Sequence, residues 1–172
     1  MADDMETWLR AVPKVELHLH LEGAIPPPAL WRLLEKYGGD PEVPDLAALR
    51  RRLTYKDFPD FIAAWIWKNR FIRSYDDFTF IAEAVARDLA AQNIGYAEVF
   101  FSPTRFLDQG LTPQGLAQAI RKGLDKVAET EVRLIADLVR GHGPEQARDT
   151  LAKISEVLDC GIVGIGIGGS EH

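Results

Sequence analysis

The pattern of apolar and polar positions divides the chain into short apolar runs separated by longer amphipathic segments. Four runs have the length and composition of buried strands, and most of them are followed by glycine or proline. They cover residues 14–21, 94–101, 131–139 and 161–167. The pattern therefore predicts four β-strands distributed along the whole chain.

The amphipathic segments between these runs predict helices. Prolines 26–28 favour a helix start, and Ser74 is a suitable cap for a long helix with apolar positions at helical spacing. Residues 45–72 form a separate helical excursion before that long helix. The predicted helices cover about 26–37, 74–89, 113–128 and 144–158.

The order of strand then helix, repeated four times, predicts an α/β fold with parallel strands and crossover helices. Four such units are half of an eight-fold barrel, which takes about 250 residues, whereas this chain has 172. A half-barrel leaves an unpaired strand edge and uncovered apolar surface. We therefore expect a fragment or one piece of a cleaved enzyme; a four-unit domain that dimerises to close a barrel is the alternative.

Composition narrows the function. The chain is 47% hydrophobic and carries a formal net charge of −6, which argues against nucleic-acid and anionic membrane partners. The one basic run, Arg50 to Arg52, is typical of a solvated helix end. No signal peptide or membrane span is evident, and Cys160 is the single cysteine, so we expect a cytoplasmic protein.

The first predicted strand carries the clearest candidate chemistry. Residues 14–23 read KVELHLHLEG. Because side chains alternate along a strand, His18 and His20 share a face with Glu16 and Glu22. The opposite, apolar face carries Val15, Leu17, Leu19 and Leu21, and we expect it to be packed.

Two histidines two positions apart on one strand can direct ring nitrogens at a single ion, as zinc sites require. His18 and His20 are therefore candidate metal ligands. The competing interpretation is a pair of buried histidines satisfied by backbone groups, which explains neither the shared face nor the neighbouring carboxylates. A tetrahedral site needs further ligands and an open position for water.

This segment resembles the start of the adenosine deaminase family, a branch of the metal-dependent amidohydrolases, in which a strand ends in His-x-His-Leu-Asp/Glu-Gly. The resemblance implies a TIM (β/α)8 barrel in which a single zinc activates water to remove the amino group from carbon 6 of a purine. Residues 1–172 would then be the N-terminal half of one catalytic domain, with residues 45–72 inserted as a helical lid.

The resemblance also implies roles for individual residues. His18 and His20 bind the metal, and His20 also borders the substrate. Glu22 accepts a hydrogen bond from a ribose hydroxyl, although a solvated strand-end acid is the alternative. Gly169 brings its backbone amide to the purine N3, unless it is a plain turn glycine. Ser170 stands where the family has aspartate, and Gly166 stands where relatives often have Asp. These departures indicate a purine-related substrate that need not be adenosine.

Aromatic residues at helical spacing lie in the 45–72 excursion. Phe58, Phe61 and Trp65 match the apolar lining of the family's lid over the purine, while an ordinary core helix remains the alternative. On the second strand, Glu98 and Ser102 could point inward and are expected to be a structural polar pair or to support the site.

The expected function is zinc-dependent hydrolytic deamination of adenosine or a related 6-aminopurine nucleoside. By resemblance, the general acid, the general base and the remaining metal ligands lie beyond residue 172, since neither His142 nor His172 falls at a position that the family uses. The missing C-terminal half is then a partner, and the chain alone is expected to be inactive. Alternatives are deamination of adenine, of an aminodeoxyfutalosine-like compound or of AMP, or a non-catalytic half-barrel binding module.

Overall fold

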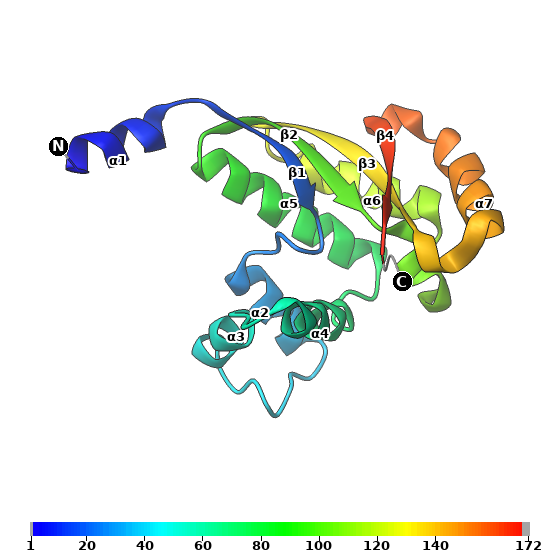
Figure 1. Cartoon of the computed structure of the whole chain (residues 1–172), viewed down its shortest axis with the longest axis horizontal. Helices are drawn as coiled ribbons and strands as arrows, with labels where there is room; N and C mark the ends of the chain where they lie inside the picture. Colours follow the sequence, from blue (N-terminus) through cyan, green and yellow to red (C-terminus); the bar gives the residue numbers. More distant parts are fainter. Residues whose placement is uncertain (1, 170–172) are drawn as a thin grey trace.

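The computed structural model describes residues 2–169, which form one parallel sheet with its strands in the order β1-β2-β3-β4 (Figure 1). The strands are β1 (Lys14–His20), β2 (Ile94–Phe101), β3 (Glu131–Val139) and β4 (Ile162–Gly168). All four expected strands are present, and only the ends of the first and last differ, by one residue. The predicted α/β class is confirmed.

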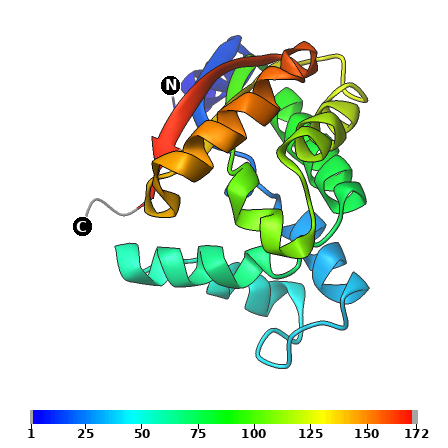
Figure 2. The same ribbon diagram turned by 90° about the vertical axis from the view of Figure 1, so that its right-hand side faces the viewer.

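The helices occupy two regions. Helices α5, α6 and α7 lie along one face of the sheet, while α2, α3 and α4 gather beyond the carboxyl ends of the strands (Figures 1 and 2). The helices are α1 (Ala2–Ala11), α2 (Pro27–Lys36), α3 (Leu46–Arg52), α4 (Phe58–Asn69), α5 (Tyr75–Ala91), α6 (Pro113–Leu124) and α7 (Gly143–Ser155). Short 3-10 turns are η1 (Pro103–Gln109), η2 (Arg140–His142) and η3 (Leu158–Cys160).

The structure adds two corrections to the expected helices. Helix α1 was not predicted from the acidic N-terminal segment, and α6 ends at Leu124, about four residues before the expected position. The expected excursion at 45–72 consists of α3 and α4, and the basic run forms the last turn of α3.

Helix α5 begins at a complete capping box. The Ser74 hydroxyl accepts from the Asp77 N–H, and the Asp77 carboxylate accepts from the Ser74 N–H. Asp77 is buried and also accepts hydrogen bonds from the Lys36 ammonium and the Tyr37 hydroxyl. The cap therefore ties the end of α2 to the start of α5.

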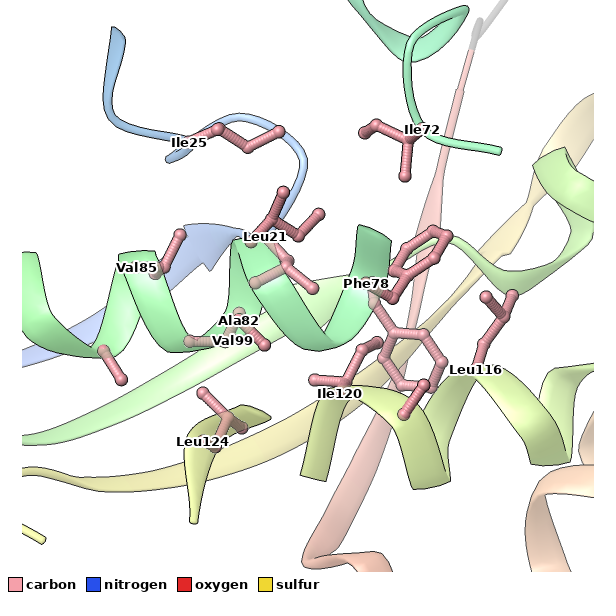
Figure 3. Packing of buried hydrophobic residues seen from close by; sticks show 14 of the residues in the cluster. Leu21, Ile25, Ile72, Phe78, Ala82, Val85, Val99, Leu116, Ile120 and Leu124 are labelled. Carbon is pink, nitrogen blue, oxygen red and sulfur yellow. The ribbon is translucent and has the colours of Figure 1, made fainter. Parts of the chain in front are cut away.

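The core lies between the sheet and helices α5 and α6 (Figure 3). Phe78 of α5 meets Phe106 edge to face, with ring centroids 4.8 Å apart, and both side chains are almost fully buried. Gly123 lets α6 approach α5 closely, since a Cβ there would lie 2.2 Å from the Thr79 carbonyl oxygen. These contacts hold the helices that support the middle of the sheet.

The apolar face of the first strand is only partly covered. Leu21 is fully buried, as expected, but Val15 and Leu17 are 65% and 56% exposed. The prediction of a packed face is therefore wrong for the first half of β1, because nothing in residues 2–169 lies against that end of this edge strand. At the opposite edge of the sheet, Val163 and Ile165 of β4 are exposed in the same way.

Cys160 is buried, as predicted for a small apolar residue. Ser170 and His172 lie outside the described residues. Within the described part of the chain, every helix is too short or too polar to cross a membrane.

Candidate active site

The two candidate metal ligands lie at the carboxyl-terminal end of β1. Their ring centroids are 5.4 Å apart; His18 is exposed and His20 is half-buried. The ring of Phe100 on β2 stacks against both imidazoles, at 4.7 Å from His18 and 5.2 Å from His20. Phe100 was not predicted as a site residue, although alternation along its strand places it on the same side of the sheet as Glu98 and Ser102.

The electrostatics of His20 favour the form that binds metals. Burial lowers the pKa of His20, the nearby His18 and Lys68 lower it further, and the charge of Asp137 opposes this shift. A neutral imidazole offers a ring nitrogen lone pair to a metal. The described residues contain no group of three or more potential ligands, so the histidine pair is the arrangement in this part of the chain to be considered for a metal.

Glu22 lies in the turn after β1 and is fully buried, which rules out a solvated strand-end acid. Its Oε1 accepts a 3.0 Å hydrogen bond from the Ser102 N–H, while its Oε2 has no partner among the described residues. Burial raises the pKa of this carboxyl, and the Ser102 N–H and the charge of Lys68 oppose the shift.

A second buried carboxylate, Asp137, was missed by sequence reasoning. Its Oδ2 lies 3.4 Å from the Ser102 hydroxyl, and burial raises the pKa of Asp137 while His20 lowers it. Asp137 lies near Glu22 and His20 because it is close to the carboxyl end of β3, and parallel strands have their carboxyl ends on the same side of the sheet. The position of an acidic residue near the end of a predicted strand could have identified Asp137 from the sequence.

Glycines on β4 make room for these side chains. A Cβ at Gly168 would lie 2.5 Å from Asp137 Oδ2, and one at Gly166 would lie 2.8 Å from a carbon of the Phe100 ring. Asp137 is also the register partner of Gly166. The glycine-rich end of the fourth strand therefore leaves the space that the side chains of Asp137 and Phe100 occupy.

The expected polar pair on β2 is not formed. Glu98 accepts a 3.0 Å hydrogen bond from the Tyr96 hydroxyl, whereas Ser102 binds Glu22 and Asp137. Ser102 therefore supports the carboxylates at the strand ends, and Glu98 takes no part in that cluster.

Lys68 is the third residue, after Phe100 and Asp137, that was not predicted from the sequence. It belongs to the last turn of α4, is 3% exposed, and has a pKa lowered to about 8 by burial, with the charge of Glu22 acting in the opposite direction. The lysine among the apolar positions of this helix could have identified Lys68 as a candidate, because lysine is rarely buried without a role.

The three aromatic candidates on α4 do not act as one surface. Phe58 is 72% exposed, and its ring lies 6.0 Å from that of Phe61, which also contacts Tyr55. Trp65 lies apart from these rings and is covered by the guanidinium of Arg105, 4.6 Å from the ring centroid. Trp65 is thus held near the end of β2, while Phe58 and Phe61 lie toward the start of α4.

Gly169 follows β4 directly and has a φ of +102°, a conformation that L side chains rarely adopt. The structure therefore explains glycine at this position by backbone geometry. Gly169 also lies at the carboxyl ends of the strands, as do the histidine pair and the two buried carboxylates.

Comparison with known proteins places this arrangement in a family. A model of the adenosine deaminase family matches residues 13–172. An adenine deaminase from Bordetella avium is 31% identical over 170 residues, which are 97% of this chain and 54% of that protein. An aminodeoxyfutalosine deaminase from Acidothermus cellulolyticus is 31% identical over 170 residues, covering 95% of this chain and 47% of that protein.

Solved structures agree with the sequence relatives. The apo N6-methyl-AMP deaminase from Arabidopsis thaliana matches with a TM-score of 0.80 and 26% identity, over 96% of this chain and 51% of that one. An amidohydrolase from Burkholderia ambifaria with bound Zn matches with a TM-score of 0.83 and 26% identity, over 96% and 46%. The chain spans about half the length of these relatives and has the architecture of the first half of their barrels. From its histidine segment to the end of the fourth strand, the chain belongs to the adenosine deaminase family.

Proposed function

We propose that the protein to which this chain contributes is a zinc-dependent hydrolytic deaminase of adenosine or a related 6-aminopurine nucleoside. The observation that carries the proposal is the His18–His20 pair at the carboxyl end of β1, in a chain of the adenosine deaminase family. Active sites of such barrels are built at the carboxyl ends of the strands.

His18 and His20 would hold the zinc, and the bound Zn of the Burkholderia ambifaria structure supports that choice of metal. Zinc in such a site lowers the pKa of water and so supplies a nucleophile at neutral pH. Phe100 stacks on both imidazoles and restricts their orientation. Asp137 lies close enough to His20 to influence its charge and completes the polar surroundings of the pair.

Substrate binding is proposed for the residues around the histidines. The Oε2 atom of Glu22, which has no partner among the described residues, accepts a hydrogen bond from a hydroxyl of the sugar. The Gly169 amide approaches the purine N3. Phe58, Phe61 and Trp65 of α4 supply apolar surface over the base. Their separation into two groups implies that only part of this surface contacts one substrate at a time.

The proton-transfer groups and remaining ligands would come from the C-terminal half of the barrel. The support is structural: β1 and β4 are the two edges of the sheet, and each exposes apolar side chains such as Val15 and Ile165. Addition of further strands and helices would pair these edges and cover these side chains.

Adenine is the second candidate substrate, since adenine deaminases from several bacteria are about 30% identical to this chain. The names of other relatives add aminodeoxyfutalosine and N6-methyl-AMP to the compounds worth testing. The alternative to an enzyme is a non-catalytic binding module. Measuring the metal content of the protein distinguishes the two.

The test uses the full-length protein and its His18→Ala variant. We expect about one zinc per wild-type active site by mass spectrometry of metals, and ammonia release from adenosine, adenine or a nucleotide. His18→Ala should lose both the zinc and at least ~100-fold in kcat/KM, because a metal ligand is removed. The exposed His142 provides the control variant, His142→Ala, which should retain both. Wild-type protein that binds no metal and releases no ammonia from any of these compounds would contradict the proposal.

A further inference from the structure

Lys68 has an environment that ordinary packing does not explain. Only 3% of this residue is exposed, and a buried ammonium is costly unless it is paired and hydrogen-bonded. Among the described residues, no hydrogen bond or direct ion pair ends on its Nζ. The side chain is thus almost entirely buried, and its ammonium has no protein partner among the described residues.

The carboxylate next to Lys68 is also incompletely bonded. The charges of Glu22 and Lys68 act on each other, yet the two groups do not form a direct ion pair in the described structure. Glu22 Oε1 is occupied by the Ser102 N–H, whereas Oε2 is buried and lacks a partner. A hydrogen-bond donor on α4 and an acceptor after β1 therefore both remain unused.

Lys68 and Glu22 lie near the carboxyl ends of the strands. Lys68 lines a cavity of about 290 Å³ together with Gly23, Ala24 and Tyr55. Its charge also acts on His20, one of the proposed metal ligands. Helix α4, whose last turn includes Lys68, lies beyond the carboxyl ends of the strands (Figures 1 and 2).

We propose that Lys68 is a specificity-determining residue, whose ammonium binds, together with the free Oε2 of Glu22, one hydroxyl of the group attached to the purine. A hydroxyl can accept from the ammonium and donate to the carboxylate, so one group satisfies both unused partners. Because Oε2 is enclosed, the side chains around it must shift when the hydroxyl binds, and the flexible four-carbon stem of Lys68 can adjust while its ammonium stays within reach. This inference rests on the proposed deaminase function and defines its substrate as hydroxylated.

Charge favours a neutral hydroxyl over a phosphate. The opposite charges of Lys68 and Glu22 cancel, which leaves no net positive charge for an anion. Lys68 also lies in the last turn of α4, where the helix dipole is negative and attracts cations rather than anions. A nucleoside therefore fits this pair better than a nucleotide.

The test compares substrates with and without the hydroxyls, using the full-length zinc-loaded protein. The panel consists of adenosine, 2′-deoxyadenosine, 3′-deoxyadenosine, adenine and AMP. Lys68→Met keeps the apolar stem and removes the charge. We expect it to lower kcat/KM for adenosine about 10- to 100-fold, the usual effect of losing a hydrogen bond to a charged group. The loss for adenine should be less than about threefold, and one deoxynucleoside should behave like adenine.

Two further variants keep the result interpretable. Lys122→Met removes an exposed lysine on α6 and should leave the whole panel unchanged. Lys68→Gln retains a neutral donor and should recover part of the lost activity toward adenosine. Equal losses on adenosine and adenine would mean a structural role for Lys68 and would overturn the proposal. A loss confined to AMP would overturn the hydroxyl assignment in favour of an anion site.

Binding separates this proposal from the proposed function. Wild-type protein that deaminates none of the panel would refute the deaminase function alone. Titration of purine ribonucleoside and of purine base against tryptophan fluorescence then tests Lys68, since Trp67 is its neighbour in the chain. Weaker binding of the ribonucleoside alone in Lys68→Met supports the proposal, whereas no difference between the two ligands overturns it.

Discussion

Asp77 shows how a single buried carboxylate connects several parts of this chain. It caps α5 and accepts hydrogen bonds from Lys36, Tyr37 and the Arg73 N–H. Burial alone would raise the pKa of Asp77, but these hydrogen bonds together outweigh burial and lower it below its ordinary value of 3.8. Asp77 is therefore ionised in the folded protein and stabilises it in that form.

The sign of this shift determines the pH at which the stability is lost. A group with a lowered pKa in the folded state contributes fully above its unfolded pKa and loses its contribution as the pH falls through the folded value. Asp77→Asn should lower the free energy of unfolding by about 2 kcal/mol at pH 7, since hydrogen bonds to a charged group are weakened. The difference from wild type should shrink below about pH 4.

Urea denaturation of the full-length protein at pH 7 and at pH 3.5 measures both effects. Asp76→Asn is the matched control, because Asp76 is an exposed neighbour on the same turn of α5. It should change the stability by less than about 1 kcal/mol. A deficit of Asp77→Asn that stays constant across this pH range would mean that the charge of Asp77 is not what stabilises the cap.

At the scale of elements, the contact between α5 and α6 depends on a glycine. A Cβ at Gly123 would lie 2.2 Å from the Thr79 carbonyl oxygen and 2.8 Å from the Ala82 Cβ. The first of these atoms belongs to the backbone of α5, so the helices must separate to admit even a methyl group.

Gly123→Ala should therefore lower the free energy of unfolding by about 1–3 kcal/mol, even though alanine favours helices by ~1 kcal/mol over glycine. Thermal unfolding checks the prediction. Gly95→Ala is the control, since a Cβ at Gly95 meets no atom within 4 Å, and its stability should equal or slightly exceed that of wild type. A Gly123→Ala protein as stable as wild type would show that α6 can shift without cost.

Helix α4 is fixed to its surroundings at more than one point. The Trp67 indole N–H donates to Asp40 at 2.7 Å, and the Arg52 guanidinium lies 4.6 Å from the Trp67 ring. On another side, Arg105 covers Trp65. These contacts fix the position of α4, the helix that carries Lys68.

At the scale of the whole molecule, the sheet is open at both edges. Val15 and Leu17 on β1, and Val163, Ile165 and Ile167 on β4, are at least half exposed. Exposed apolar surface of this kind marks an interface. The described residues also hold two candidate zinc ligands where a catalytic site uses three or four.

Residues 1–172 prepared alone should therefore show no deaminase activity and should bind zinc far more weakly than the full-length protein. Adding the remaining polypeptide as a separate chain should restore both, because it would cover the edges of the sheet and supply the missing ligands. Ammonia release and zinc titration with a competing chelator measure the two properties. Turnover by the 172-residue chain alone would refute this expectation.

The sequence by itself determined the strands, the crossover order, the histidine pair and the family. Each is written in local patterns: alternation along a strand, helical spacing between Ser74 and Leu89, and a motif of ten residues. These patterns can be recognised without knowledge of the rest of the fold, because they depend only on residues that are close in the chain. Among the elements of residues 2–169, helix α1 and the 3-10 turns were not predicted, and the ends of some elements differ from the prediction.

The tertiary structure alone decided which side chains meet. Glu22, Lys68 and Asp137 come from the turn after β1, from α4 and from the end of β3, and no local pattern relates them. Their meeting follows from the strand register, from the space left by Gly166 and Gly168, and from the anchoring of α4. The exposure of Val15 and Leu17 has the same origin, since an apolar face is buried only where another part of the molecule lies against it.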